Sequence, residues 1–166
     1  RDVGGAGTQT SALAFGGFIP PAVQSLTEEY DGTTWTAQNA MGTARRSPAG
    51  AGTQTAALAI GGAEPAVTTK TEAYNGASWT AGGVMGSARS AMAAGGTQTA
   101  AISFGGYPST TNAQTYNGTG WTAVNVMINK HNHSRNMGCW RSFSNRLIVP
   151  RGLWHKNGWF SSWWLS

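Results

Sequence analysis

The most constraining feature of the sequence is a threefold internal repeat. The tetrapeptide Gly-Thr-Gln-Thr begins at Gly7, Gly52 and Gly96. Paired glycines, a tyrosine, a tryptophan and a methionine then follow in the same order: Gly16, Gly17, Tyr30, Trp35 and Met41; Gly61, Gly62, Tyr74, Trp79 and Met85; and Gly105, Gly106, Tyr116, Trp121 and Met127. This period of 42 to 45 residues predicts one structural unit per repeat. The units fall at about 4–48, 49–92 and 93–127.

Each repeat carries the local signals of β-strands. The segment from Gly7 to Gly17 has the small, β-compatible composition of a strand packed between close neighbours, and Leu13 and Phe15 lie two apart, on one face. We expect the glycine pair to end this strand where the backbone needs a positive φ or a close approach. A second extended run leads from Val23 to Tyr30.

A turn signal follows the tyrosine in every repeat. The dipeptides at this place are Asp31-Gly32, Asn75-Gly76 and Asn117-Gly118. They suit a type I′ turn, in which both central residues have positive φ, so the sequence predicts a hairpin that leads into the tryptophan. No amphipathic helical pattern interrupts the repeat, so the predicted fold class is all-β, with three or four strands per repeat.

The order of the repeated residues resembles the kelch family. The first two copies contain Gly16-Gly17, Glu28, Tyr30-Asp31, Trp35, Met41 and Arg45, and then Gly61-Gly62, Glu72, Tyr74-Asn75, Trp79, Met85 and Arg89. The third copy has Gln114 in place of the glutamate and lacks the arginine. The resemblance, over about three-quarters of the chain, implies kelch-like β-propeller blades. Short Thr/Ala-rich repeats of this kind are similar to those of phage and other viral structural proteins.

Three blades cannot close a propeller, which needs about four to eight. We therefore expect the chain to be a fragment, to self-associate into a ring, or to leave an open sheet edge that is prone to pairing. The start at Arg1, without a methionine, favours a fragment or a processed product. Neither a signal peptide nor a membrane-spanning apolar stretch is recognisable in the sequence.

Residues 128–166 differ in composition from the repeats. They hold six basic and no acidic residues, all three histidines, the only cysteine and five of the eight tryptophans, whereas residues 1–127 have a net charge of −1. A forward shift of one base turns every tryptophan codon into a glycine codon, and Trp154 to Trp164 then follows the repeat strand in register. We interpret this irregular Trp/Arg-rich tail as a repeat in the wrong frame, whether by a biological event or by an error of sequencing.

The sequence predicts no metal site, no cofactor and no nucleic-acid or membrane partner. A zinc set could be assembled from His131, His133, Cys139 and His155. Its spacing matches no usual pattern, and all four residues lie in the tail. The pI near 9.9 also comes from the tail, so it does not indicate a nucleic-acid surface on the repeats.

Catalytic residues are not predicted either. Residues 1–127 contain no histidine and no cysteine, which excludes His-dependent and Cys-dependent nucleophiles there. Glu28 and Glu72 could serve a glycosidase only as a positioned pair. They occupy the same place in successive repeats and should point in the same direction, which favours a structural role.

The repeated aromatic and basic residues have two interpretations each. Tyr30, Trp35 and the corresponding residues either lock neighbouring repeats together in the core or, if exposed, form a sugar-stacking platform. We favour the core. Arg45 and Arg89 are expected to bond to the backbone of the neighbouring repeat rather than to a ligand.

Function is expected to depend on the segments that vary among the copies. These run from Phe18 to Gln24, from Ala63 to Thr69 and from Tyr107 to Asn112, with Phe18, Ile19, Glu64 and Tyr107 as candidate binding residues. The leading hypothesis is a structural or protein-interaction module of a larger fibre, virion or appendage protein. The alternatives are a module that binds surface glycans through these loops and, more remotely, a glycan-active enzyme.

Overall fold

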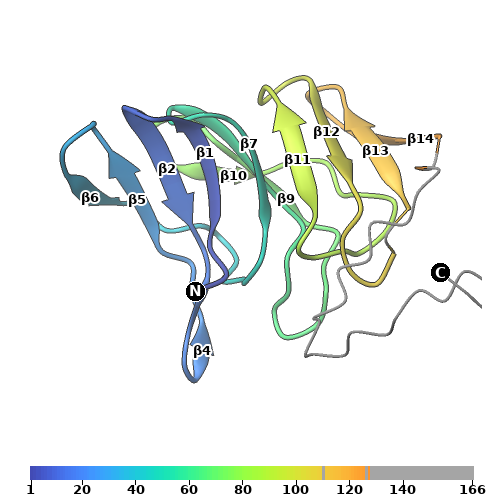
Figure 1. Ribbon diagram of the computed structural model, residues 1–166, viewed down its shortest axis with the longest axis horizontal. Coiled ribbons are helices and arrows are strands. Elements are labelled where there is room, and N and C mark those ends of the chain that lie inside the picture. Colours follow the sequence, from blue (N-terminus) through green and yellow to red (C-terminus); the bar gives the residue numbers. More distant parts are fainter. Residues whose placement is uncertain (110, 126, 128–166) are drawn as a thin grey trace, which may run out of the picture. The chain divides into compact units, whose positions relative to one another are not determined.

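The described part of the chain is built of β-strands alone. The computed structural model describes residues 1–109, 111–125 and 127, which contain no helix, and hence no helix that could cross a membrane. Its strands are β1 (Gly4–Thr8), β2 (Ser11–Phe15), β3 (Phe18–Ile19), β4 (Ala22–Val23), β5 (Thr27–Tyr30), β6 (Trp35–Gln38), β7 (Ala49–Thr53), β8 (Ala56–Ile60), β9 (Thr71–Tyr74), β10 (Trp79–Ala81), β11 (Ala93–Gly96), β12 (Ala101–Phe104), β13 (Ala113–Tyr116) and β14 (Trp121–Val124) (Figure 1). The predicted all-β class is confirmed.

Each sequence repeat forms one four-stranded antiparallel sheet. Sheet 1 has the order β1-β2-β5-β6, sheet 2 the order β7-β8-β9-β10 and sheet 3 the order β11-β12-β13-β14, while β3 and β4 form a separate hairpin. Within the described residues no sheet closes on itself. Below, residues at the same place in different repeats are called equivalent.

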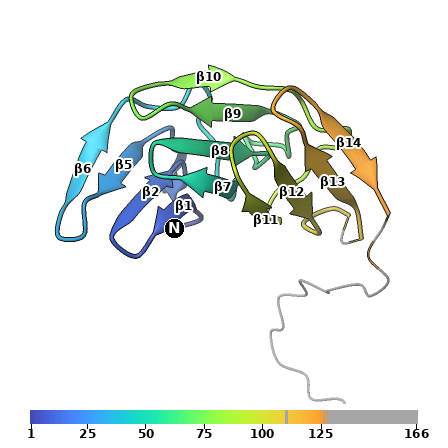
Figure 2. The same ribbon diagram turned by 90° about the horizontal axis from the view of Figure 1, so that it is seen from above.

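The sheets pack face to face through their small and apolar side chains. Strand β7 contacts both β1 and β11, so the first strands of the three sheets lie side by side (Figure 2). The core between sheets 1 and 2 contains Leu13, Phe15, Met41, Ala57, Ala59, Tyr74 and Trp79. The core between sheets 2 and 3 contains Ala49, Ala51, Leu58, Ile60, Met85, Met92, Ala101, Tyr116 and Trp121.

The predicted strand from Gly7 to Gly17 is wrong in its first half. Thr8 pairs with Ser11, so the Gln-Thr of the tetrapeptide forms a tight turn that joins β1 to β2. Gly7 has a φ of 106°, and a Cβ there would overlap the backbone oxygen of Ser11. The repeated glycine therefore marks the entry to a hairpin, because other residues rarely adopt this backbone conformation.

The glycine pairs behave as predicted. Gly16 and Gly17 have φ values of 69° and 110°, and the other two pairs are also positive. The N–H of Gly17 donates to the carbonyl of Arg45 at 2.9 Å. The pair thus ends β2 and lets the connection between sheets 1 and 2 approach closely.

The hairpin after each tyrosine is confirmed, but the predicted type I′ turn is wrong. Tyr30 pairs with Trp35, which leaves a four-residue loop, and only Gly32 within it has positive φ. The Asp31 carboxylate instead accepts the N–H groups of Thr33 and Thr34, each at 2.8 Å. Asn75 and Asn117 accept equivalent bonds, so Asp or Asn is needed here for its side-chain oxygen.

This turn gives a prediction that depends on pH. Hydrogen bonds from Thr34 and Thr33 lower the pKa of Asp31 well below its usual range. The resulting stabilisation is fully present above the unfolded pKa, about 4, and is lost as the pH falls through the folded pKa. Asp31→Ala is expected to lower the melting temperature at pH 7, whereas Asp31→Asn keeps the turn, as Asn75 does. Between about pH 5 and pH 2, wild type should lose more stability than Asp31→Asn. Parallel acid titrations of the two proteins, followed by circular dichroism, measure this difference, and equal losses of stability would contradict the prediction.

Candidate functional site

The three variable segments lie at the same end of the sheets. Each connects the second strand of its sheet to the third, and the β3–β4 hairpin forms the first of them (Figure 1). Each contains a cis peptide bond before a proline: Pro20-Pro21, Glu64-Pro65 and Tyr107-Pro108. No repeated motif of the sequence marks these prolines.

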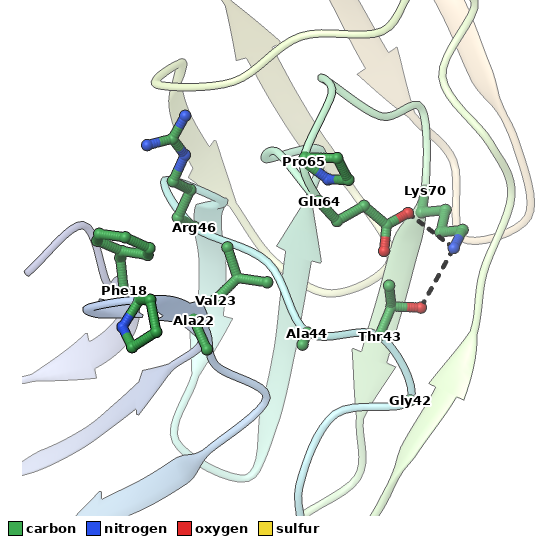
Figure 3. Close-up of a pocket in the computed structure, with 11 residues that line it drawn as sticks. Phe18, Ala22, Val23, Gly42, Thr43, Ala44, Arg46, Glu64, Pro65 and Lys70 are labelled. Atoms are coloured by element: carbon green, nitrogen blue, oxygen red, sulfur yellow. Dashed lines mark hydrogen bonds and ion pairs between the residues drawn. The ribbon is translucent and has the colours of Figure 1, made fainter.

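The first two variable segments both line one groove. Its volume is about 720 Å³, and Figure 3 shows the side chains around it. One wall comes from the first segment, the opposite wall from the second, and the floor from the connection between β6 and β7. The lining residues are Phe18, Pro21, Ala22, Val23, Gly42, Thr43, Ala44, Arg46, Glu64, Pro65 and Lys70.

Charge is distributed unevenly along the groove. The Lys70 ammonium lies 2.8 Å from the Glu64 carboxylate and 3.5 Å from the Thr43 hydroxyl (Figure 3). At the other side the Arg46 guanidinium stacks 5.7 Å from the centre of the Phe18 ring. Among the described residues Arg46 forms no ion pair. Lys70 is also exposed but is paired with Glu64, so among the described lining residues Arg46 is the exposed cation without an ion pair, and it lies beside an apolar wall. The Arg1 guanidinium lies 5.3 Å from the centre of the same Phe18 ring.

The structure brings some of the candidate binding residues together and separates others. Phe18 and Glu64 both line the groove, one from each of the first two variable segments. Ile19, which is 57% exposed, and Tyr107, which is 68% exposed, do not line it. Arg46 and Lys70 were missed as groove residues. Nothing in the sequence shows that the 42–46 connection passes between the two variable segments, or that Lys70, just after the second segment, lines the same groove.

The two repeated arginines are fully buried between sheets. Arg45 donates from Nη1 to the carbonyl of Lys70 at 3.1 Å and from Nη2 to the Glu72 carboxylate at 3.0 Å. Arg89 donates to the carbonyls of Gly105 and Asn112 at 2.9 and 2.8 Å. Desolvation lowers the pKa of both guanidinium groups, and for Arg45 the charge of Glu72 opposes this shift. Both side chains thus bind the neighbouring sheet and not the groove.

The tyrosine and tryptophan of sheets 2 and 3 pack against the preceding sheet. Trp79 lies edge-on to Phe15 with ring centres 5.1 Å apart, and its indole Nε1 donates to the Thr27 hydroxyl at 2.9 Å. The Tyr74 hydroxyl donates to Glu29 at 3.0 Å. Burial, together with this hydrogen bond, raises the pKa of Tyr74 to about 12. In sheet 1, by contrast, Trp35 is 53% exposed.

This contrast gives a stability prediction. Trp79→Phe is expected to lower the free energy of unfolding by about 1–2 kcal/mol, because it removes the bond to Thr27 and part of the contact with Phe15. Trp35→Phe should cost less than about 0.5 kcal/mol, since Trp35 is half exposed and no sheet of the described residues precedes sheet 1. Urea unfolding of both variants is the measurement, and equal losses would contradict the assignment.

The two carboxylates considered as a catalytic pair, Glu28 and Glu72, lie in different sheets and in different surroundings. Glu72 accepts bonds from Arg45 and from the N–H of Gly42, while Glu28 is exposed on the other side of sheet 1. No group of three or more metal-ligating side chains occurs in the part of the chain that the structure describes. His131, His133, Cys139, His155 and the proposed out-of-frame repeat lie outside that part.

No family model matches the chain, and no curated protein matches it. The kelch-like resemblance therefore stays a prediction made from the order of the repeated residues.

Proposed function

We propose that this chain is a non-catalytic protein-interaction module made of kelch-like blades, within a larger fibre, virion or appendage protein. The observation that carries the proposal is the groove between the first two variable segments. The sheets beneath it repeat nearly the same residues, while the groove walls differ from copy to copy. A scaffold that is constant beneath surfaces that vary is typical of binding proteins.

The groove chemistry suggests what kind of protein segment binds. Phe18, Pro21 and Val23 form an apolar wall, and Arg46 places an exposed cation next to it. A segment that carries an aromatic or aliphatic side chain and a carboxylate one or two residues away satisfies both features. Glu64 keeps Lys70 neutralised, so Arg46 is the main selector for the acidic residue.

Selection from a display library of random peptides against the full chain tests this proposal. Enriched peptides should combine an acidic with an apolar residue. Arg46→Ser should weaken their binding about tenfold or more. Serine is a matched replacement, since Ser90 holds the equivalent place in the second repeat and makes the same backbone bridge. Peptides that bind Arg46→Ser equally well would contradict the proposal.

A replacement of the first variable segment tests the glycan alternative. Binding of the full chain to a glycan array, abolished when residues 18–24 are replaced by glycine and serine, would favour a carbohydrate-binding module over a protein-binding one.

A further inference from the structure

One face of sheet 1 repeats a buried surface of sheets 2 and 3, but none of the described strands packs against it. In sheets 2 and 3 four side chains of this face contact the preceding sheet or the segment that connects it to the next one. They are Gln54, Glu72, Tyr74 and Trp79 in sheet 2, and Gln98, Gln114, Tyr116 and Trp121 in sheet 3. Their equivalents in sheet 1 are Gln9, Glu28, Tyr30 and Trp35.

The glutamine of each Gly-Thr-Gln-Thr turn holds the preceding sheet. Gln54 Nε2 donates to the carbonyls of Ala12 and Tyr30 at 3.2 and 2.7 Å. Gln98 Nε2 donates to the equivalent carbonyls of sheet 2. Gln9 is exposed and forms no hydrogen bond within the described residues. This glutamine can hold any antiparallel strand pair, because it binds backbone atoms.

The tryptophan requires a hydroxyl from the preceding sheet. Trp79 and Trp121 donate to Thr27 and Thr71 at 2.9 and 3.0 Å, which are equivalent threonines. Trp35 has the same tilted packing on Tyr30 as these tryptophans have on their tyrosines, with ring centres 5.1 Å apart. The aromatic pair of sheet 1 is therefore already arranged as in the buried interfaces.

Sheet 1 has a cavity at the place that corresponds to the site of Arg45 in the interface between sheets 1 and 2. Arg45 donates to the carbonyls of Ala59 and Lys70 and to the Glu72 carboxylate. The equivalents of these three residues are Ala14, Leu26 and Glu28, and all of them line a cavity of about 160 Å³ in sheet 1. Ala14, Leu26 and Glu28 thus stand at the places of the three residues that bind the Arg45 guanidinium, and a carboxylate with backbone carbonyls suits a guanidinium. The chain's own Arg1 is a further lining residue of this cavity.

We propose that this face of sheet 1 binds a further four-stranded sheet of the same type as sheets 1 and 2. The added sheet places an arginine in the cavity beside Glu28 and offers a threonine hydroxyl to the Trp35 indole. This inference rests on the scaffold part of the proposed function and is independent of the groove.

The chain's own third sheet does not match this face. Sheet 3 has Ala113 where Thr27 and Thr71 stand, so it offers no hydroxyl to Trp35. His131 follows Met127 at the place of the arginine. The matching faces of sheets 1 and 2 are already covered by sheets 2 and 3. A second copy of the chain is therefore a poorer occupant than another repeat that carries both residues.

A duplication within the full chain tests the proposal. A second copy of residues 4–48 is inserted between Val3 and Gly4, with its own tryptophan replaced by phenylalanine. Exchange of the Trp35 indole proton, followed by NMR, should slow about tenfold or more on insertion. A copy of residues 49–92 at the same place, with Trp79→Phe within it, brings Thr71 and Arg89 and should give the same protection. This second chain keeps the test valid if the first fails to fold.

A double-mutant cycle measures the interaction between the added arginine and Glu28 in this cavity. Arg45→Met in the added copy and Glu28→Gln in the resident repeat should each lower the folding equilibrium constant about tenfold or more, and the double variant should lose no more than either one. An added copy with Thr27→Ala and Arg45→Met, which imitates sheet 3, should give little protection.

Three results would overturn the proposal: unchanged Trp35 exchange in both extended chains, additive losses in the cycle, or a dimer of the unextended chain with Trp35 already protected. The last would assign the face to a second copy. Arg46→Ser in the extended chains should leave Trp35 protection unchanged, which separates this inference from the groove proposal.

Discussion

Glu72→Gln is expected to lower the free energy of unfolding by about 3 kcal/mol or more, because it leaves a buried cation without its anion. Arg45 is fully buried and Glu72 nearly so, and their charged atoms lie 3.0 Å apart. The Arg45 Nε atom has no hydrogen-bond partner among the described residues, so the ion pair carries much of the compensation for desolvation. A loss of this size is a large part of the stability of a small domain.

The interface between sheets 2 and 3 provides the matched control. There Gln114 stands in place of the glutamate, still accepts the N–H of Gly86 at 3.1 Å, and leaves Arg89 without an acidic partner among the described residues. Arg89 donates instead to the Ser103 hydroxyl at 3.2 Å. Ala59 is the equivalent of Ser103 in sheet 2.

Ala59→Ser should therefore rescue Glu72→Gln by about 1–2 kcal/mol, since a hydroxyl acceptor for a charged donor is restored. In wild type, where Glu72 is present, Ala59→Ser should give no such gain. Denaturant unfolding of the four chains measures both effects. A Glu72→Gln variant as stable as wild type, or a double variant no better than the single, would contradict the compensation.

Gly50→Ala is expected to destabilise the chain by about 3 kcal/mol, at the upper end of what overpacking costs. Gly50 lies in β7 with its Cα against β1, and an added Cβ would overlap the backbone oxygen of Gly5. A backbone atom cannot move aside as a flexible side chain can. Sheets 1 and 2 would have to separate along their first strands, which pack against each other.

Gly95→Ala is the control for this substitution. Gly95 lies in β11, the equivalent strand of sheet 3, and a Cβ there meets no atom within 4 Å. We expect it to change the free energy of unfolding by less than about 0.5 kcal/mol. Both variants should be compared by urea unfolding and by circular dichroism at 25 °C. Equal stability of the two would show that the first strands are not in backbone contact.

The proposed binding groove depends on contacts that no local pattern reveals. Variation among repeats identified the segments that contain Phe18 and Glu64, since only the comparison of three copies was needed. That these two line one groove, while Tyr107 does not, follows from how sheets 1 and 2 pack. Arg46 and Lys70 gave no signal, because single charges in connecting segments are common on any surface.

The sequence by itself determined the features that depend on neighbours along the chain. Repeat spacing predicted three units, alternation and turn dipeptides predicted strands and hairpins, and the glycine pairs predicted positive φ, because each is set by local backbone sterics. The turn at Gln9 was missed for a related reason: a short small-residue hairpin has the composition of one continuous strand.

Only the tertiary structure decided what the repeated side chains do. Sequence alone left Trp35 and Trp79 equivalent, yet one is exposed and the other packs on Phe15. Glu28 and Glu72 differ in the same way. The difference arises because burial depends on whether a sheet has a neighbour on that face, and residues some forty positions away in the sequence supply the neighbour.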